Sequence, residues 1–357
     1  MVIGLICSSS ISLTKWTSYF QGRAQVAQSR QRRCSRWFHN PRIKVHQLYR
    51  PLIQGALASW GASVMVLIMD TSMLWERYCL IRVCVQYRGG AVPIAWRVME
   101  HGSSSVKFND YQPLLRRASR LVPKGMEIRF LADRGFADTR LLDYLTQQLH
   151  WHYRIRIKSS FWVSTGTQWR QVKDWHLGLG EAVCLHGVRI TKGHAYGPVH
   201  LALAHDAQSG EYWSVVSDQS TTLQTFAQYA QRFDIEENFL DDKSNGFQLE
   251  QSLIRSASAL SRLCLVLAIT TLLLTVQGQQ VVATGQRRRV DCHWHRGCSY
   301  FRIGWDWLRA VIHQHWTFFS TLRLSGVPDA LPATASRKQA QKSFQREFTV
   351  RFYQYAT

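Results

Sequence analysis

Residues 64–72 read VMVLIMDTS, an uninterrupted apolar run from Val64 to Met69 that ends on Asp70. An apolar run without alternation is typical of a strand buried on both faces, as found in α/β proteins. Asp70 is also the first acidic residue of the chain. A carboxylate beside a buried strand is costly unless it is paired or binds a cation. This stretch therefore predicts an α/β fold with a charged group at the end of a central strand.

The residues that follow alternate between β and α patterns. Gly89-Gly90 separates the next two β runs and favours a hairpin. A later strand pattern, Glu127–Ala132, also runs directly into an aspartate, Asp133. We expect strands at 64–69, 77–87, 91–98, 127–132 and 151–158, with helices at 111–121 and 138–149. The predicted order of this part is βββαβαβ.

Asp70 and Asp133 would meet at one edge of the sheet if their two strands are parallel neighbours. That edge is where open α/β sheets bind ligands. Two close carboxylates repel each other, and Mg²⁺, which prefers oxygen ligands, would offset their charge. Taken alone, however, an aspartate after a strand is more often a turn or cap residue.

Charge is distributed unevenly along the chain. The 357 residues contain 44 Lys and Arg against 23 Asp and Glu, a formal net charge of +21. Residues 1–69 carry nine basic side chains and no acidic one, and residues 285–357 carry twelve basic and four acidic ones. Such basic ends favour a polyanionic partner, with nucleic acid the obvious candidate. A merely basic soluble protein is the alternative.

Composition and spacing also predict how the chain is organised. The expected regions are a basic helical DNA-binding region that is short for a complete domain (1–61), the first part of the α/β core (62–158), a β-rich insertion (159–219), the second part of the core (220–280) and a basic C-terminal region (281–357). The longest apolar stretch, Leu263–Val276, is short for a membrane span and fits a buried helix, so no membrane partner is expected.

The eight cysteines have irregular spacing and no CxxC pair, which indicates a reducing, cytoplasmic compartment rather than a disulfide framework. Cys292, His293, His295 and Cys298 could form a metal cluster, but their spacing matches no common zinc site. Ordinary surface thiols and imidazoles are the favoured interpretation of this group.

A helical pattern begins near Thr221 and is expected to reach about Ser252. At about 100° per residue, one stripe of this helix carries the four side chains of Tyr229, Arg232, Glu236 and Lys243. The same geometry turns Glu237 away from the stripe and selects Glu236 as the inward acid. A surface face with a simple Arg232–Glu236 ion pair is the alternative.

The spacing Y-x2-R-x3-E-x6-K of these four residues is similar to the signature of bacterial insertion-sequence transposases of family four. The segments around Asp70 (68–72), Asp133 (133–138) and Trp213 (213–217) resemble further segments of that family. The resemblance implies an Asp-Asp-Glu enzyme with a ribonuclease H-like core: a mixed five-stranded sheet with helices on both faces, a β-rich insertion before the last catalytic helix, and a helical basic N-terminal region.

The resemblance also implies roles for individual residues. Asp70, Asp133 and Glu236 would hold two Mg²⁺ ions, for which Mn²⁺ can substitute. The DNA-binding side chains would be Tyr229, Arg232 and Lys243 on phosphates and Trp213 on an extruded base, with Arg134 near the scissile phosphate. Trp213 could instead be a core residue, and Arg134 could merely offset the charge of the carboxylates.

The implied reaction is cleavage at the terminal inverted repeats of the transposon through a hairpin intermediate, followed by strand transfer into target DNA. The implied partners are double-stranded DNA and a second copy of the chain, in the bacterial cytoplasm with the nucleoid. Two alternatives stay open: a structure-specific nuclease on the same core, and a catalytically inactive DNA-binding remnant.

Overall fold

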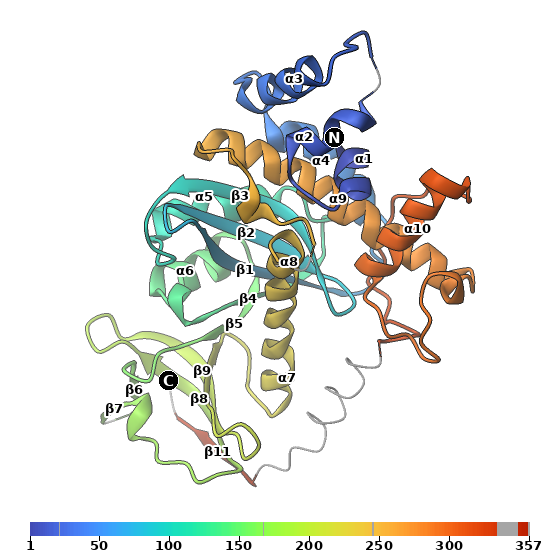
Figure 1. Cartoon of the computed structure of the whole chain (residues 1–357). Coiled ribbons are helices and arrows are strands. Elements are labelled where there is room, and N and C mark those ends of the chain that lie inside the picture. The colour runs from blue at the N-terminus through green and yellow to red at the C-terminus, as the bar shows by residue number, and fades with distance from the viewer. Residues whose placement is uncertain (21, 167, 245, 334–348, 356–357) are drawn as a thin grey trace.

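The computed structural model describes residues 1–357 except residues 21, 167, 245, 334–348 and 356–357. Its described strands form one mixed sheet in the order β3-β2-β1-β4-β5-β10-β9-β8-β6-β7, with β11 paired to β8 (Figure 1). The strands are β1 (Val64–Leu74), β2 (Tyr78–Gln86), β3 (Ala91–Glu100), β4 (Glu127–Ala132), β5 (His152–Arg156), β6 (Trp162–Ser164), β7 (Trp169–Gln171), β8 (Glu181–Ile190), β9 (Tyr196–His205), β10 (Tyr212–Ser217) and β11 (Thr349–Gln354).

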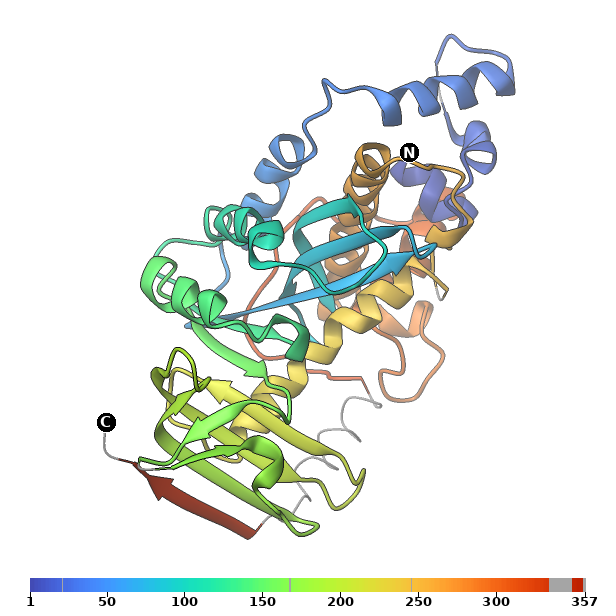
Figure 2. The same ribbon diagram turned by 90° about the vertical axis from the view of Figure 1, so that its left-hand side faces the viewer.

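Helices cover both sides of the first five strands. In Figure 2, α5 and α6 lie on one side of β1–β3, and α8 and α9 lie on the other. The described helices are α1 (Val2–Ser8), α2 (Leu13–Trp16), α3 (Ala27–His39), α4 (Val45–Leu57), α5 (Phe108–Ser119), α6 (Thr139–Asp143), α7 (Gln224–Ala230), α8 (Asp234–Asp242), α9 (Ala257–Ala283) and α10 (Tyr300–Gln314). The predicted order βββαβαβ is confirmed by β1, β2, β3, α5, β4, α6 and β5.

The central strand β1 is longer than its apolar run. Its parallel pairing with β4 ends at Met69 and Ala132, but its antiparallel pairing with β2 continues to Leu74. The prediction that this strand ends on Asp70 was therefore wrong. Asp70 is instead the first residue beyond the parallel ladder, and it remains within the strand because β2 still supplies backbone hydrogen bonds there.

The sheet is wider than the five-stranded core that we expected. The free edge of β5 pairs with β10, for example at Arg156 and Val215, so the β-rich segment continues the core sheet. Such pairing satisfies backbone groups that an open sheet edge would leave exposed. β11, from the far C-terminal segment, adds to this part by parallel pairing with β8.

The helix that follows β10 is shorter than predicted. It consists of α7, a 3₁₀ turn at 231–233 and α8, which ends at Asp242 rather than near Ser252. Lys243 leaves the helical conformation with φ −90° and ψ −101°. The chain then turns back, and Phe247 becomes fully buried against the ring of Trp305. The backbone N–H of Phe247 donates to the carbonyl of Asp241 at 2.9 Å, and a Cβ at Gly246 would lie 2.0 Å from that oxygen, so a glycine is required where the helix ends.

The apolar helix α9 is long and apolar enough to cross a membrane by length and composition, the one such helix among the described residues. However, 83% of its most apolar window is buried inside the protein, where it packs against β3 and α10. Core helices of soluble proteins can be equally long and apolar. The burial of α9 agrees with the buried helix that the sequence predicts.

Candidate active site

The side chain of Arg232 forms ion pairs with two of the predicted acidic residues, Asp70 and Glu236. Arg232, in the 3₁₀ turn between α7 and α8, donates from Nη1 to Oδ2 of Asp70 at 3.0 Å. Its Nη2 donates to Oε1 of Glu236, on the first turn of α8. Arg232 is only 7% exposed, so this group is not the solvated surface pair that the spacing alone left open. One guanidinium bridges a strand carboxylate and a helix carboxylate.

The third acid lies beside the first because of the strand register. Met69 of β1 pairs in parallel with Ala132 of β4, so Asp70 and Asp133 are the next residues of two adjacent strands. The Asp133 carboxylate accepts a hydrogen bond from the backbone N–H of Gly135 at 2.9 Å. This bond orients the side chain at the C-terminal edge of the parallel strands, the edge where α/β sheets bind ligands.

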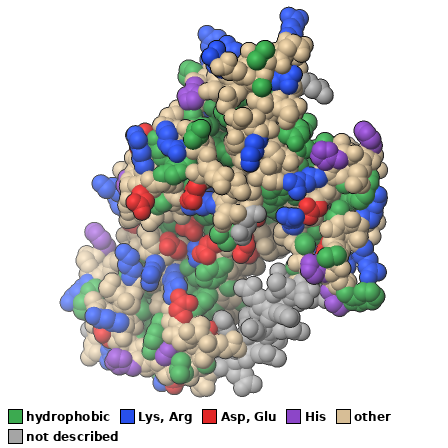
Figure 3. Space-filling view, viewed as in Figure 1, with side chains coloured by type: hydrophobic (Ala, Val, Ile, Leu, Met, Phe, Trp, Pro, Cys, Tyr) green, Lys and Arg blue, Asp and Glu red, His purple; other side chains and the backbone are tan. Residues whose placement is uncertain are grey.

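The electrostatics of Asp70 reflect this convergence. Burial raises the pKa of Asp70 to about 6, and the nearby carboxylates of Asp133 and Glu236 raise it as well. The Arg232 guanidinium and the backbone N–H of Thr71 act in the opposite direction. Asp133 and Glu236 are therefore each close enough to Asp70 to disfavour its charged form, and Arg232 opposes this effect. Figure 3 shows Asp and Glu side chains gathered in the middle of this face, with Lys and Arg around them.

Tyr229 and Trp213 form an aromatic wall next to the acids. Burial raises the pKa of Tyr229 to about 12; Arg232 opposes the shift and Asp133 adds to it. The Trp213 ring meets the ring of Tyr229 edge-to-face at 5.8 Å. Trp213 is 8% exposed, yet it borders a cavity of about 530 Å³ that Arg134 and Arg156 also line. The ring is thus both a core residue and part of a cavity wall next to the acids.

Lys243 is the predicted site residue that the structure does not bring to the carboxylates. Because α8 ends before it, its Nζ donates to the backbone carbonyl of Met73 at 2.8 Å and pairs with Glu250 at 3.1 Å. It fastens the segment after α8 to the far end of β1. The predicted helical stripe thus holds for Tyr229, Arg232 and Glu236 and was wrong for Lys243.

Glu237 faces away from this site, as predicted. It lines a separate cavity together with Asp234 and Asp241. Asp234 accepts a hydrogen bond from Gln86 at 2.7 Å. Burial and the charges of Asp242 and Glu237 raise the pKa of Asp241 to about 8.

The raised pKa of Asp241 has a consequence for stability. A folded-state pKa above the unfolded value means that folding disfavours the charged form, so stability is lost as pH rises from about 4 to about 8. We expect Asp241→Asn to increase the free energy of unfolding above about pH 8 and to leave it unchanged near pH 4. Urea unfolding of both proteins across this range measures the difference. A difference that is the same at both ends of the range would contradict the assignment.

A buried ion pair between Arg82 and Asp242, which was not predicted from the sequence, links β2 to the helix that carries Glu236. Arg82 of β2 stands opposite Asp70 in the β1–β2 register. Its side chain, 1% exposed, pairs with Asp242 at 2.6 Å and donates to Oδ1 of Asn238 at 2.7 Å. Both partners are on α8, the helix that carries Glu236. The available signal was an arginine within the apolar strand pattern of residues 79–85, because a charged side chain there must find a buried partner.

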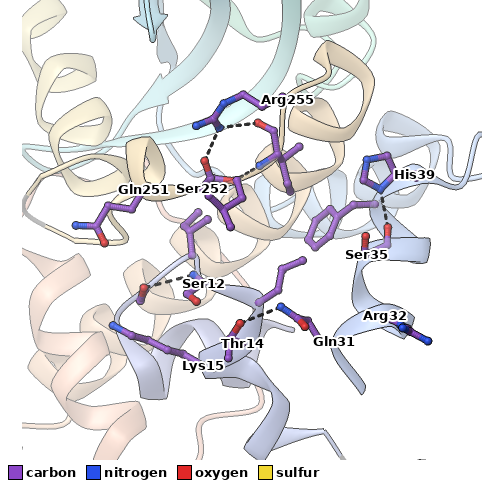
Figure 4. A pocket seen from close by; sticks show the side chains of 16 residues that line it. Ser12, Thr14, Lys15, Gln31, Arg32, Ser35, His39, Gln251, Ser252 and Arg255 are labelled. Carbon is purple, nitrogen blue, oxygen red and sulfur yellow. Dashed lines mark hydrogen bonds between the residues drawn. The ribbon is translucent and has the colours of Figure 1, made fainter. Parts of the chain in front are cut away.

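A second, basic cavity, which none of the three acids lines, lies between the N-terminal helices and residues 251–255 (Figure 4). Its volume is about 560 Å³, and its lining includes Lys15, Arg32, His39 and Arg255 but no acidic residue. Hydroxyl and amide groups such as those of Ser12 and Gln31 line the same space. This composition suits an anionic ligand.

Comparison with known proteins gives one finding, at the level of fold. No protein-family model and no curated protein matches the chain. A search of solved structures finds a chain of the "piggyBac transposase synaptic complex with hairpin DNA", determined by cryo-EM. The TM-score is 0.50 at 11% sequence identity, over 85% of this chain and 67% of that one. The two chains share a fold. At this identity, the similarity extends to architecture and no further.

Proposed function

We propose that this protein is a DNA transposase with a ribonuclease H-like core, which cleaves phosphodiester bonds at transposon ends and joins them to target DNA. The observation that carries the proposal is the convergence of Asp70, Asp133 and Glu236 at the edge of two parallel strands. The similarity to a transposase whose solved complex contains hairpin DNA supports it. The bacterial insertion-sequence origin, the cytoplasmic location and a dimer acting on paired ends belong to the same proposal.

The donor chemistry of the three carboxylates suits Mg²⁺, or Mn²⁺ in its place. All of their donors are oxygens, which Mg²⁺ prefers, and their mutual repulsion leaves negative charge that Arg232 only partly offsets. Asp70, Asp133 and Glu236 would hold two ions. Bound there, the metal would stabilise the charge on the phosphoryl oxygens and activate the attacking hydroxyl.

The remaining side chains would position DNA. Arg232 would exchange its carboxylate partners for a phosphate of the bound strand, with charge-assisted hydrogen bonds. The Tyr229 hydroxyl would lie beside the same phosphate. Trp213 would stack on an unpaired base that enters the adjoining cavity, where Arg134 and Arg156 would balance phosphate charge. Lys243 would act farther along the strand, because it lies near Met73 rather than the acids.

The basic ends of the chain would hold the duplex on either side of the cut. The cavity lined by Lys15, Arg32, His39 and Arg255 offers positive charge and hydrogen-bond donors for backbone phosphates. In this proposal residues 70–284, which carry 23 basic and 19 acidic side chains, hold the metal, while the two ends supply most of the DNA affinity.

A cleavage assay on the terminal inverted repeats that flank the gene tests the proposal. We expect nicking at the repeat ends with Mg²⁺ or Mn²⁺, hairpin products, joining to a target duplex, and no reaction with EDTA. Binding without nicking would favour an inactive DNA-binding remnant. Cleavage that ignores the repeats and gives no joined product would favour a structure-specific nuclease.

A further inference from the structure

We propose that the loop between α9 and α10 binds a transition-metal ion of the Zn²⁺ class through Asp291, His293 and Cys298. The ligand atoms of these three side chains all lie within 4.8 Å of one another. The set differs from the group that the sequence suggested as a possible but disfavoured metal cluster, which included Cys292 and His295 and omitted Asp291. None of its three ligands is one of the carboxylates of the proposed active site, so the two proposals stand independently.

The Asp291 carboxylate is the fixed member of the set. Its side chain is fully buried, and its Oδ2 accepts hydrogen bonds from Nη1 of Arg287 at 2.9 Å and from the backbone N–H of Gly297 at 3.1 Å. These bonds hold one oxygen and turn the other, Oδ1, toward His293. Partners of this kind orient a carboxylate ligand and tune its affinity for metal.

The position of His293 depends on a glycine. A Cβ atom at residue 297 would lie 2.4 Å from both Cγ and Nδ1 of the His293 ring, closer than atoms can approach. Only glycine therefore allows the ring to lie against this backbone. So placed, Nδ1 is 2.6 Å from Oδ1 of Asp291. A metal ion can take the place of the hydrogen bond between these two atoms, because metal ligands bind in their deprotonated forms.

The donor chemistry selects the kind of metal. One carboxylate oxygen, one imidazole nitrogen and one thiolate sulfur suit Zn²⁺ or Co²⁺, whereas Mg²⁺ favours oxygen ligands alone. Three protein ligands leave a fourth tetrahedral position for water or another group. The His293 side chain is 58% exposed, so the site is open to solvent on that side.

Cobalt titration of the full-length protein, stripped of metal with a chelator, tests this site. We expect uptake of Co²⁺ with a thiolate-to-cobalt charge-transfer band in the near ultraviolet and loss of that band on adding Zn²⁺ but not Mg²⁺. Cys298→Ser should abolish the band. The matched control is Cys292→Ser, which changes an exposed thiol in the same loop and should leave the band intact. Co²⁺ bound at the three active-site carboxylates would have no sulfur ligand and would give no such band.

Gly297→Ala keeps all three proposed ligands and changes only the space available to the His293 ring. It therefore tests whether Co²⁺ affinity depends on the arrangement of the ligands or only on the Cys298 thiol. Gly297→Ala should displace the His293 ring and weaken Co²⁺ affinity by about tenfold or more, with circular dichroism verifying that the protein remains folded. Folded wild-type protein that gives no charge-transfer band would overturn the proposal, as would a band lost in Cys292→Ser and kept in Cys298→Ser. Equal affinity in wild type and Gly297→Ala would overturn the assigned role of His293. None of these outcomes depends on whether the protein cleaves DNA.

Discussion

We expect Glu236→Gln to lower metal-dependent DNA cleavage by about 10³-fold and Glu237→Gln to leave it near the wild-type rate. The two substitutions are chemically identical and one residue apart on α8. Glu236 faces Arg232 and Asp70, while Glu237 lines a different cavity with Asp241. Removing the charge of Glu236 takes away one of three carboxylates that would hold the metal, and removing that of Glu237 does not.

Single-turnover nicking of an end-containing duplex measures this difference, with a gel-shift assay run in parallel. DNA binding should persist in Glu236→Gln, because loss of a carboxylate makes the site more positive. Its stability should change by less than about 1 kcal/mol, because the Glu236 side chain is 49% exposed and the buried Arg232 keeps its ion pair with Asp70. Equal losses in both variants, or cleavage that survives Glu236→Gln, would contradict the site.

The convergence of the three acids could be predicted because it depends on short-range patterns. An apolar run followed by Asp70 and another followed by Asp133 identify two buried strands. Parallel register then places the two aspartates side by side, as the pairing of Met69 with Ala132 demonstrates. The offset of four residues between Arg232 and Glu236 is one helical turn. The period of each element predicted the two strands and the helical turn one at a time. That the two strands are parallel neighbours was a condition of the prediction, and the joint role of the three acids came from the resemblance to the transposase family.

Features set by contacts between distant segments could not be predicted in the same way. The failure of the stripe at Lys243 is an exception, because Gly246 is a local helix-stop signal: a Cβ there would lie 2.0 Å from the carbonyl oxygen of Asp241, where α8 ends. The pairing of β5 with β10 joins two segments far apart in the sequence. In the α9–α10 loop, Asp291 lies beside His293 because Arg287 and Gly297 hold its carboxylate, and the spacing of Cys and His residues alone does not record that contact.

The largest stability effect is expected from breaking the ion pair beneath the site. Arg82→Ala leaves the carboxylate of Asp242 buried without its partner, which costs about 3–5 kcal/mol of stability. The loss is greatest near neutral pH. Burial raises the pKa of Asp242 and Arg82 opposes the shift, so without Arg82 the carboxyl is protonated more readily on acidification and the penalty shrinks. Urea unfolding at neutral and acidic pH measures both the loss and its pH dependence.

Two further variants serve as controls: one breaks an exposed ion pair, and the other replaces both Arg82 and Asp242 by apolar residues. Arg302→Ala breaks the exposed pair with Asp306 on α10 and should cost less than about 1 kcal/mol. Replacing Arg82 by Met and Asp242 by Leu together should recover most of the stability, because apolar side chains of similar volume can substitute for a buried pair.

The cleavage rate of this double variant shows whether the Arg82–Asp242 pair only stabilises the fold or also positions Glu236. If the double variant is stable but cleaves slowly, Arg82 positions α8, and with it Glu236, rather than merely holding the fold. A double variant that is both stable and fully active would limit the pair to stability.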